Sequence, residues 1–251
     1  MSKPTIGTQE QWDRARAALL EREDEVSKLA GEVNEQRRAL PWVPVEKTYT
    51  FATDEGTKTL AELFDGRSQL LIYHLMFGPD YTGACPGCSG LADHFDGGVV
   101  HLNHRDVTLI AMSRTPLHKI QAYKQRMGWH FPWVSAFGSD FNRDFGFEMT
   151  GEQMASEELR TMVDKAPDWL REWAVAVGTE LKTGLVEGPG WNVFAMADGT
   201  VHHTYSRHAP DGDMLVPYHF LLLDQVPAGR GDSFRALRHD EYGQAMAVAS
   251  S

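Results

Sequence analysis

Two cysteines, Cys85 and Cys88, stand three positions apart in the sequence CPGC and are the only cysteines among the 251 residues. In proteins of reducing compartments, two thiols at this spacing are typical of redox-active or metal-binding sites. A disulfide framework of the secreted kind needs more cysteines, spread along the chain. The chemistry that the sequence favours is therefore thiol chemistry centred on this pair.

The residues around CPGC place the first cysteine at the start of a helix. Residues 70–76 (LLIYHLM) form a continuous apolar run that predicts a buried strand, and a helical pattern follows from Pro86 to about residue 95. Unpaired N–H groups and the helix dipole stabilise a thiolate at such a position, and only the thiolate attacks. We therefore predict that Cys85 is the more acidic thiol and the attacker, while Cys88 resolves a mixed disulfide.

Two further side chains are candidates for proton transfer at the thiols. His74 lies in the apolar strand that leads to the motif, and Asp80 lies in the loop between that strand and Cys85. An imidazole or a carboxylate close to the sulfurs could assist the proton transfers that thiol exchange requires. The alternative for His74 is the role of a hydrogen-bonded core residue.

A metal site is the second interpretation of the same cysteines. Copper or zinc could be bound by Cys85, Cys88 and a histidine such as His74 or His203. The chain would then be a metal-thiolate protein or a metalloenzyme. We favour redox cycling without a cofactor, because the helix start gives a physical reason for an activated thiolate.

Alternating strand and helix patterns around the motif predict a β-α-β sheet. Residues 107–112 (VTLIAM) form a second continuous apolar run, joined to residues 70–76 by the helix that starts at CPGC. Helical crossovers join parallel strands, so we predict that these two segments are neighbouring parallel strands of one sheet. Residues 192–205 predict a hairpin that turns at Asp198-Gly199.

Two helical segments lie outside this pattern. Residues 8–40 predict a long N-terminal helix, which starts with a capping box of Thr8 and Gln11 and carries apolar residues at spacings of three, four or seven: Trp12, Ala15, Leu19, Val26, Leu29 and Val33. This helix is an arm packed on the domain, a homodimer seam, or the partner surface of a non-enzymatic interaction module. Residues 148–190 predict an acidic helical insertion, and no element is predicted after Arg230.

Four stretches of the sequence are similar to a known protein family. They are residues 63–79 (LFDGRSQLLIYHLMFGP), 85–97 (CPGCSGLADHFDG), 105–147 and 199–232. On these motifs the chain resembles the mostly bacterial thioredoxin-like proteins catalogued as domain of unknown function 899. The resemblance implies a thioredoxin-like core, distantly similar to the peroxiredoxin branch, with thiol redox activity inferred from the cysteines.

The motif departs from the better-known thioredoxin-like families. Ala84 precedes Cys85 where thioredoxins carry a tryptophan, and a proline follows the first cysteine, as in glutaredoxins. Thr82 stands three residues before Cys85, as a threonine or serine does in peroxiredoxins, but Pro79 matches the rest of that pattern only in part. The resemblance therefore implies a redox thiol without choosing between disulfide exchange and peroxide reduction.

Composition limits the partners that we expect. The chain has 35 acidic against 24 basic residues, a formal net charge of −11. Nucleic acids and anionic membranes are bound by clustered Lys and Arg, so we expect neither as a partner, and we expect a protein or small-molecule thiol or disulfide as substrate. The absence of a signal-like or membrane-spanning apolar run leads us to expect a cytoplasmic location. The sequence thus predicts one thioredoxin-like α/β domain over residues 1–251, with a central sheet flanked by helices.

Overall fold

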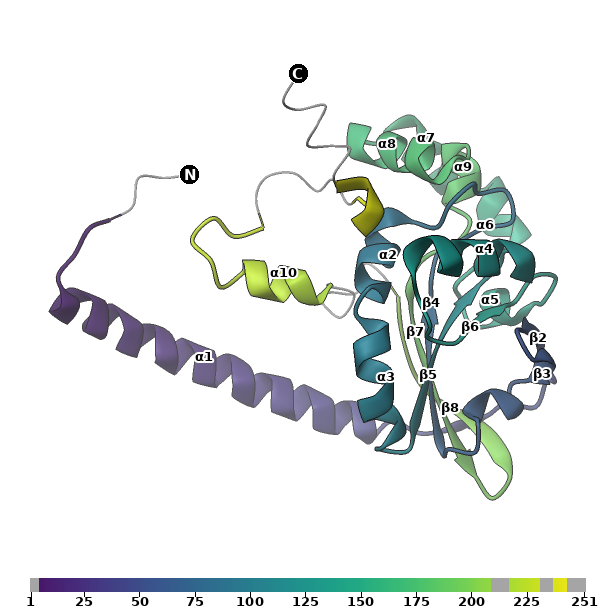
Figure 1. Ribbon diagram of the computed structural model, residues 1–251, viewed down its shortest axis with the longest axis horizontal. Helices are drawn as coiled ribbons and strands as arrows, with labels where there is room; N and C mark the ends of the chain where they lie inside the picture. Colours follow the sequence, from purple (N-terminus) through teal and green to yellow (C-terminus); the bar gives the residue numbers. More distant parts are fainter. Residues whose placement is uncertain (1–4, 209–216, 231–236, 243–251) are drawn as a thin grey trace. The chain divides into compact units, whose positions relative to one another are not determined.

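The computed structural model describes residues 5–208, 217–230 and 237–242. The chain divides into two compact units, one up to Trp42 and the other from Val43 onward. In the first unit the described residues form one long helix, α1 (Gln9–Arg38), which begins at the predicted capping box of Thr8 and Gln11. The second unit contains the sheet and the helices that cover it (Figure 1).

An eight-stranded sheet in the order β1-β8-β7-β4-β5-β6-β2-β3 forms the centre of the second unit. Strands β4 and β5 are parallel neighbours, in a register that pairs Leu70 with Thr108 and His74 with Met112, so the predicted pairing is confirmed. The strands are β1 (Val43–Pro44), β2 (Thr50–Thr53), β3 (Gly56–Thr59), β4 (Gln69–His74), β5 (Val107–Ser113), β6 (Trp133–Ser135), β7 (Gly190–Ala197) and β8 (Thr200–His208).

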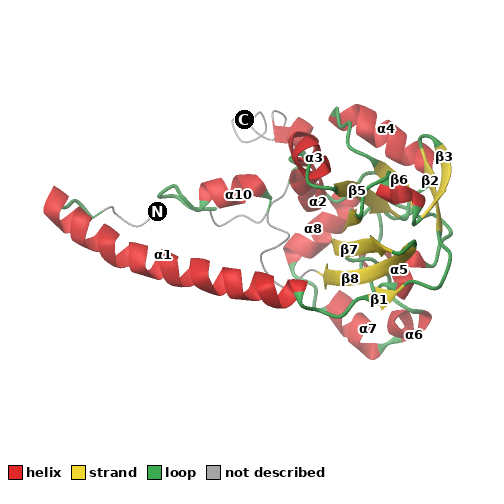
Figure 2. Cartoon of the chain, turned by 90° about the horizontal axis from the view of Figure 1, so that it is seen from below, coloured by secondary structure: helices red, strands yellow, loops and turns green. Residues whose placement is uncertain are grey.

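The four strands β5-β4-β7-β8 form the thioredoxin-like core that the sequence predicts. Strand β4 pairs with β5 in parallel and with β7 antiparallel, and β8 extends the sheet as the second arm of the β7–β8 hairpin. The hairpin turns at Asp198 and Gly199, both with positive φ. Figure 2 shows the hairpin beside the short strand β1.

Strand β4 is apolar along its length because both faces of the sheet are covered. Successive side chains of a strand point to opposite faces. Tyr73 joins a core cluster that also contains Cys85 and Cys88, and we name this side of the sheet the thiol face. Ile72 joins a second cluster with Phe141 on the other side, which we name the far face.

Helices cover the two faces unequally. Buried side chains of the thiol face come from α2 (Pro86–Ala92), α3 (Phe95–Asn103), α4 (Leu117–Met127) and α8 (Asp168–Val177). The far face is covered by η1 (Glu62–Phe64) and α5 (Phe141–Asp144). The crossover from β4 to β5 contains two helices where the sequence predicts one, because α2 ends at Ala92 and α3 begins at Phe95.

The predicted insertion at residues 148–190 contains α6 (Gly151–Ala155), α7 (Glu157–Asp164), α8 and α9 (Leu181–Gly184). In the described part of the chain after the hairpin, the helices are α10 (Tyr218–Leu223) and η3 (His239–Glu241). Within the described ranges of the chain, none of the helices combines the length and the apolar character needed to cross a membrane.

Candidate functional site

Cys85 is the N-cap residue of α2 and directly precedes Pro86 in the first turn, which is the position that the sequence predicts. Its backbone N–H donates to the carbonyl of Met76 at 2.9 Å and so ties the motif to the end of β4. Both cysteines are free thiols; Cys85 is 7% exposed and Cys88 is 3% exposed. The two thiols therefore lie just beneath the surface, and Cys85 is the more accessible.

Hydrogen-bond donors converge on the sulfur of Cys85. The thiol of Cys88 lowers the pKa of Cys85 most, and the backbone N–H groups of Cys88 and Gly87 act in the same direction. The indole Nε1 of Trp173 donates to the same sulfur at 3.2 Å. Burial opposes these donors, but they prevail, and the pKa of Cys85 lies below that of an ordinary thiol.

Cys88 is in the opposite electrostatic situation. Burial raises its pKa well above the ordinary value, and the neighbouring Cys85 sulfur raises it further. A hydrogen bond with the buried hydroxyl of Tyr73 lowers the pKa of Cys88 but does not offset the burial. The pair therefore combines a thiol at Cys85 that ionises more readily than an ordinary cysteine with a thiol at Cys88 that holds its proton more tightly.

Trp173 is held in place by close packing with two other residues. The Tyr81 ring meets the indole edge-on at a centroid distance of 6.1 Å, and the Tyr81 hydroxyl donates to the carbonyl of Gly184 at 2.8 Å. A Cβ at position 184 would lie 2.6 Å from the indole, so only glycine fits there. The insertion thus supplies the donor to Cys85 and also the surface that fixes it.

The loop before Cys85 is clamped by Arg238, which is 5% exposed. Its Nε and Nη2 atoms donate to the carbonyl of Ala84 at 3.1 and 2.7 Å, and Nη2 also donates to the carbonyl of Ala176 at 2.9 Å. The guanidinium is neutralised by Glu241, whose Oε1 lies 2.8 Å from Nη1. Arg238 therefore joins the thiol loop to α8, the helix that carries Trp173.

A buried carboxyl group, Glu187, lies behind the same loop. It is 6% exposed, and its Oε1 makes no hydrogen bond within the described residues. Burial raises the pKa of Glu187 to about 7, although the positive charge of Arg114 opposes the shift. A Cβ at Gly78 would lie 3.1 Å from this Oε1 and 2.8 Å from the Tyr81 ring, so glycine is required where the loop leaves β4. The charge of Cys85 also acts on Glu187, which couples the carboxyl to the thiol pair.

The predicted pairing of His74 with the cysteines needs correction, because the imidazole lies on the far face. Its ring stacks on Phe147 at a centroid distance of 3.7 Å, and its Nε2 accepts a hydrogen bond from Asn192 Nδ2 at 3.0 Å. Burial lowers the pKa of His74 to about 3, with a smaller contribution from the charge of His208. His74 is therefore a neutral core residue and does not meet the thiols, since Tyr73, its neighbour in β4, occupies that side.

The other candidates also lie apart from the sulfurs. Asp80 is exposed in the loop after β4 and makes no hydrogen bond to either cysteine in the described structure. His203 lies on β8 with its Nε2 3.2 Å from Asn192 Oδ1, in the same far-face network as His74. Among the residues that the structure describes, no three His, Cys, Asp or Glu side chains are grouped so that they could hold a metal ion. The alternative copper or zinc ligands are thus divided between the two faces of the sheet.

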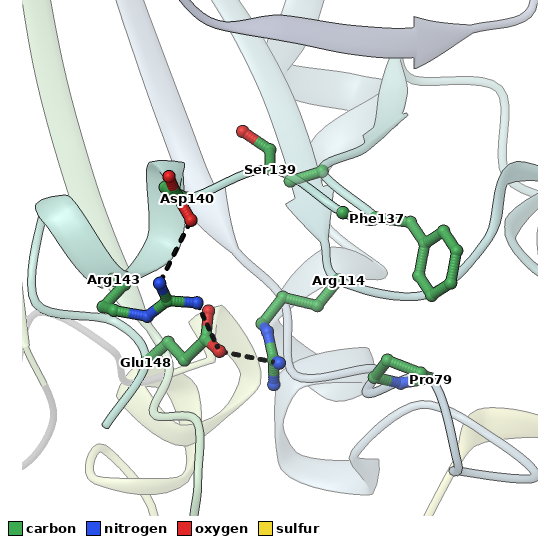
Figure 3. A pocket seen from close by; sticks show the side chains of 9 residues that line it. Pro79, Arg114, Phe137, Ser139, Asp140, Arg143 and Glu148 are labelled. Atoms are coloured by element: carbon green, nitrogen blue, oxygen red, sulfur yellow. Dashed lines mark hydrogen bonds and ion pairs between the residues drawn. The ribbon is translucent and has the colours of Figure 1, made fainter. Parts of the chain in front are cut away.

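A cavity of about 160 Å³ opens where the parallel strands β4, β5 and β6 end (Figure 3). Its walls include Phe137, two arginines and Pro79, which lies in the loop between β4 and Cys85. Figure 3 shows Arg114 and Arg143 directed at the carboxylate of Glu148, with Nη–Oε1 distances of 2.9 and 3.6 Å. Both arginines are therefore paired inside the cavity.

Trp173, Glu187 and Arg238 are the site residues that sequence reasoning misses. Trp173 and Glu187 lie in the segment interpreted as an insertion, and Arg238 lies where no element is predicted. One signal could have drawn attention to the insertion: a tryptophan in an acidic amphipathic helix, at a position that turns out to be half-buried.

Comparison with solved structures finds several similar chains. A peroxiredoxin Q mutant from Xanthomonas campestris is 13% identical, with a TM-score of 0.42 over 66% of this chain and 82% of that one. A PrxQ mutant from Xylella fastidiosa is 16% identical, with a TM-score of 0.41 over 80% and 89% of the two chains. Peroxidoxin BcpB from Mycobacterium tuberculosis is 13% identical, with a TM-score of 0.40 over 65% and 82%.

No curated protein matches the sequence. The model of one family matches residues 1–242, and that family is described as bacterial protein of unknown function (DUF899). This match spans both units of the chain, including α1, the sheet and the thiol pair. The chain therefore belongs to the DUF899 family.

Proposed function

We propose that the chain is a thiol–disulfide oxidoreductase or thiol peroxidase in which Cys85 attacks and Cys88 resolves. The observation that carries the proposal is the unequal state of the two thiols. Donors converge on the Cys85 sulfur, whereas Cys88 is buried behind it and holds its proton. A thiolate with a resolving thiol one helical turn away is the arrangement that a two-step exchange needs.

In disulfide exchange, the Cys85 thiolate attacks one sulfur of the substrate disulfide. A new S–S bond forms at Cys85, the substrate S–S bond breaks, and the first substrate thiolate leaves. Cys88 then loses its proton to a departing thiolate and attacks the Cys85 sulfur, which releases the second substrate sulfur. Two electrons pass from the dithiol to the substrate, and the chain is left with a Cys85–Cys88 disulfide.

In peroxide reduction the same thiolate attacks the terminal oxygen of a hydroperoxide. The O–O bond breaks, an alcohol leaves after taking a proton from solvent, and Cys85 becomes a sulfenic acid. Attack by Cys88 then expels water and gives the same disulfide. In both reactions a dithiol reductant must restore the free thiols, so the two activities differ only in the oxidant.

In this proposal Glu187 takes the place of His74 and Asp80 as the ionisable group that acts on the thiols. Its pKa of about 7 allows it to hold or release a proton near neutral pH. Its electrostatic coupling to Cys85 supports a role in setting the thiolate population. We assign it a positioning role through charge, since no hydrogen bond joins it to either sulfur in the described residues.

Replacing Cys88 with Ser tests the order of attack. The variant loses the resolving step, so incubation with bis(2-hydroxyethyl) disulfide is expected to trap a mixed disulfide on Cys85, identified by peptide mass. With hydrogen peroxide the same variant is expected to give a dimedone-reactive sulfenic acid if the chain is a peroxidase. Comparison of the two trapping rates chooses between the activities.

The Cys85→Ser variant is the matched control and is expected to trap neither adduct. Trapping on Cys88 in that variant, at the rate seen in Cys88→Ser, would reverse the two roles. Failure of both variants and of the wild-type dithiol to react with either oxidant would overturn the proposal.

A further inference from the structure

A stripe of apolar side chains with a period of seven runs along α1. The residues that repeat at every seventh position are Trp12, Leu19, Val26 and Val33. Ala15 and Leu29 lie three positions after Trp12 and Val26. All six side chains are exposed, and no residue of α1 is buried. Apolar residues at the first and fourth positions of successive heptads are the pattern by which helices meet in a coiled coil.

This stripe is too apolar and too long to be explained as scattered surface residues. The helix has 30 residues, and its large stripe side chains are between 43% (Val33) and 66% (Val26) exposed. Most of the stability of a helix in a protein comes from packing one apolar face against another element. The stripe therefore calls for a partner surface that is equally long, narrow and apolar.

We propose that α1 pairs with α1 of a second copy of this chain in a parallel, two-stranded coiled coil. A second copy supplies a stripe of matching length by symmetry. The identities along the stripe favour two strands, since β-branched Val26 and Val33 occupy the first heptad position and Leu29 the fourth. The proposal concerns assembly and is independent of the thiol chemistry.

Charge complementarity selects the parallel orientation. In a parallel pair, Glu32 lies opposite Arg37 of the second copy, and symmetry gives this ion pair twice. The other flanking positions also avoid like charges, because they pair Gln11 with Arg16, Ala18 with Glu23, and Glu25 with Ala30.

An antiparallel pair of the same stripes would be less favourable. It would gather Glu23 and Glu25 of both copies about the two-fold axis and place Arg22 opposite Val26. In the parallel pair, Arg22 faces Arg22 of the second copy, but each guanidinium is already paired with Glu25 of its own helix. Two of the fourth heptad positions, Arg22 and Gln36, are thus polar, and polar residues at core positions fix the register at some cost in stability.

The mass of the full-length chain in solution tests the pairing. Light scattering during size-exclusion chromatography is expected to give twice the chain mass of 28.1 kDa. The double variant Leu19→Glu/Val26→Glu places charge in the seam and is expected to halve that mass. The matched control is Leu20→Glu/Ser27→Glu, which adds the same charges one position along, outside the stripe, and is expected to remain dimeric.

A monomeric wild type, including one in which α1 packs on its own chain, overturns the proposal. A dimer that survives Leu19→Glu/Val26→Glu does so as well, since the interface would then lie elsewhere. Orientation is tested in a chain with Cys85→Ser and Cys88→Ser, where Leu29→Cys is expected to form a disulfide-linked dimer on oxidation. Leu20→Cys in the same background is the control and is expected to form none. A dimer in which Leu29→Cys fails to cross-link overturns the parallel arrangement.

Discussion

The indole Nε1 of Trp173 donates a hydrogen bond to the sulfur of Cys85 over 3.2 Å, from a helix 88 residues further along the chain. Trp173→Phe removes this donor and keeps an aromatic ring. Because a hydrogen bond to a charged group contributes about 1.5 kcal/mol, we expect the pKa of Cys85 to rise by about one unit. The rate of alkylation by iodoacetamide as a function of pH measures this pKa. Trp169→Phe, at an exposed position of the same helix, is the control; equal profiles for both variants would deny the indole this role.

The two thiols should differ in reactivity. With less than one equivalent of alkylating reagent near pH 7, we expect labelling at Cys85 and little at Cys88, since the pKa of Cys85 is lowered and that of Cys88 is raised. Labelling of Cys85 should fall away only below the ordinary thiol pKa of about 8.5. Peptide mapping after digestion measures the ratio, and preferential labelling of Cys88 would contradict the assignment.

Glu187 should make the protein less stable as the pH rises. Its pKa is about 7 in the folded chain and 4.5 ordinarily, so the folded state holds a proton that the unfolded state has lost. The stability that this group contributes is complete below pH 4.5 and declines up to about pH 7, by at most about 1.4 kcal/mol per pH unit. Glu187→Gln removes the titration, so the variant should gain stability relative to wild type between these pH values. Urea denaturation at several pH values tests this, with Glu172→Gln at an exposed position as the control.

His74 should act on stability in the opposite sense. Its pKa is about 3 when folded and 6.5 ordinarily, so the unfolded state takes up a proton first as the pH falls. The folded state therefore loses stability from pH 6.5 down to about pH 3, by at most about 1.4 kcal/mol per unit. His74→Gln should flatten this acid limb and leave the alkylation profile of Cys85 unchanged, whereas exposed His101→Gln should alter neither. A shift of the Cys85 profile in His74→Gln would return His74 to the thiol site.

Arg238 should protect the thiols by holding the loop before Cys85. Arg238→Gln removes charged donors from the carbonyls of Ala84 and Ala176, and we expect a loss of about 2 kcal/mol of stability. Alkylation of the buried Cys88 should accelerate more than that of Cys85, because Cys88 gains more access when the loop opens. Arg160→Gln, at an exposed position on α7, is the control. Equal acceleration in both variants would show that the clamp does not shield the pair.

The parts of the fold that are local in sequence could be predicted. The apolar runs at residues 70–76 and 107–112 correspond to β4 and β5. These strands are apolar throughout because both faces of the sheet are covered, and that pattern is visible in the sequence. The position of Cys85 before α2 follows from the strand, the loop and Pro86. The alternation of side chains along a strand places His74 and Tyr73 on opposite faces of the sheet. No local pattern shows on which of the two faces the loop after β4 will place Cys85 and Cys88.

The surroundings of the thiols could not be predicted, because they come from distant segments. Trp173 reaches Cys85 across 88 positions, and Arg238 reaches Ala84 across 154. Glu187 lies in the same insertion and carries no motif that distinguishes it from the exposed glutamates near it. Such contacts depend on tertiary packing and leave no periodicity in the sequence.

The clamp of Arg238 on Ala84 also has a consequence for how the protein matures. Contacts between residues so far apart are costly in loop entropy and form slowly, and synthesis delivers the N-terminal segments first. All strands among the described residues precede Arg238 in the chain, so these strands can pair before Arg238 holds the loop that leads to Cys85. We therefore expect the shielding of the pair to be completed only after the sheet has formed, so that the thiols of a newly made chain are more accessible than those of the finished fold.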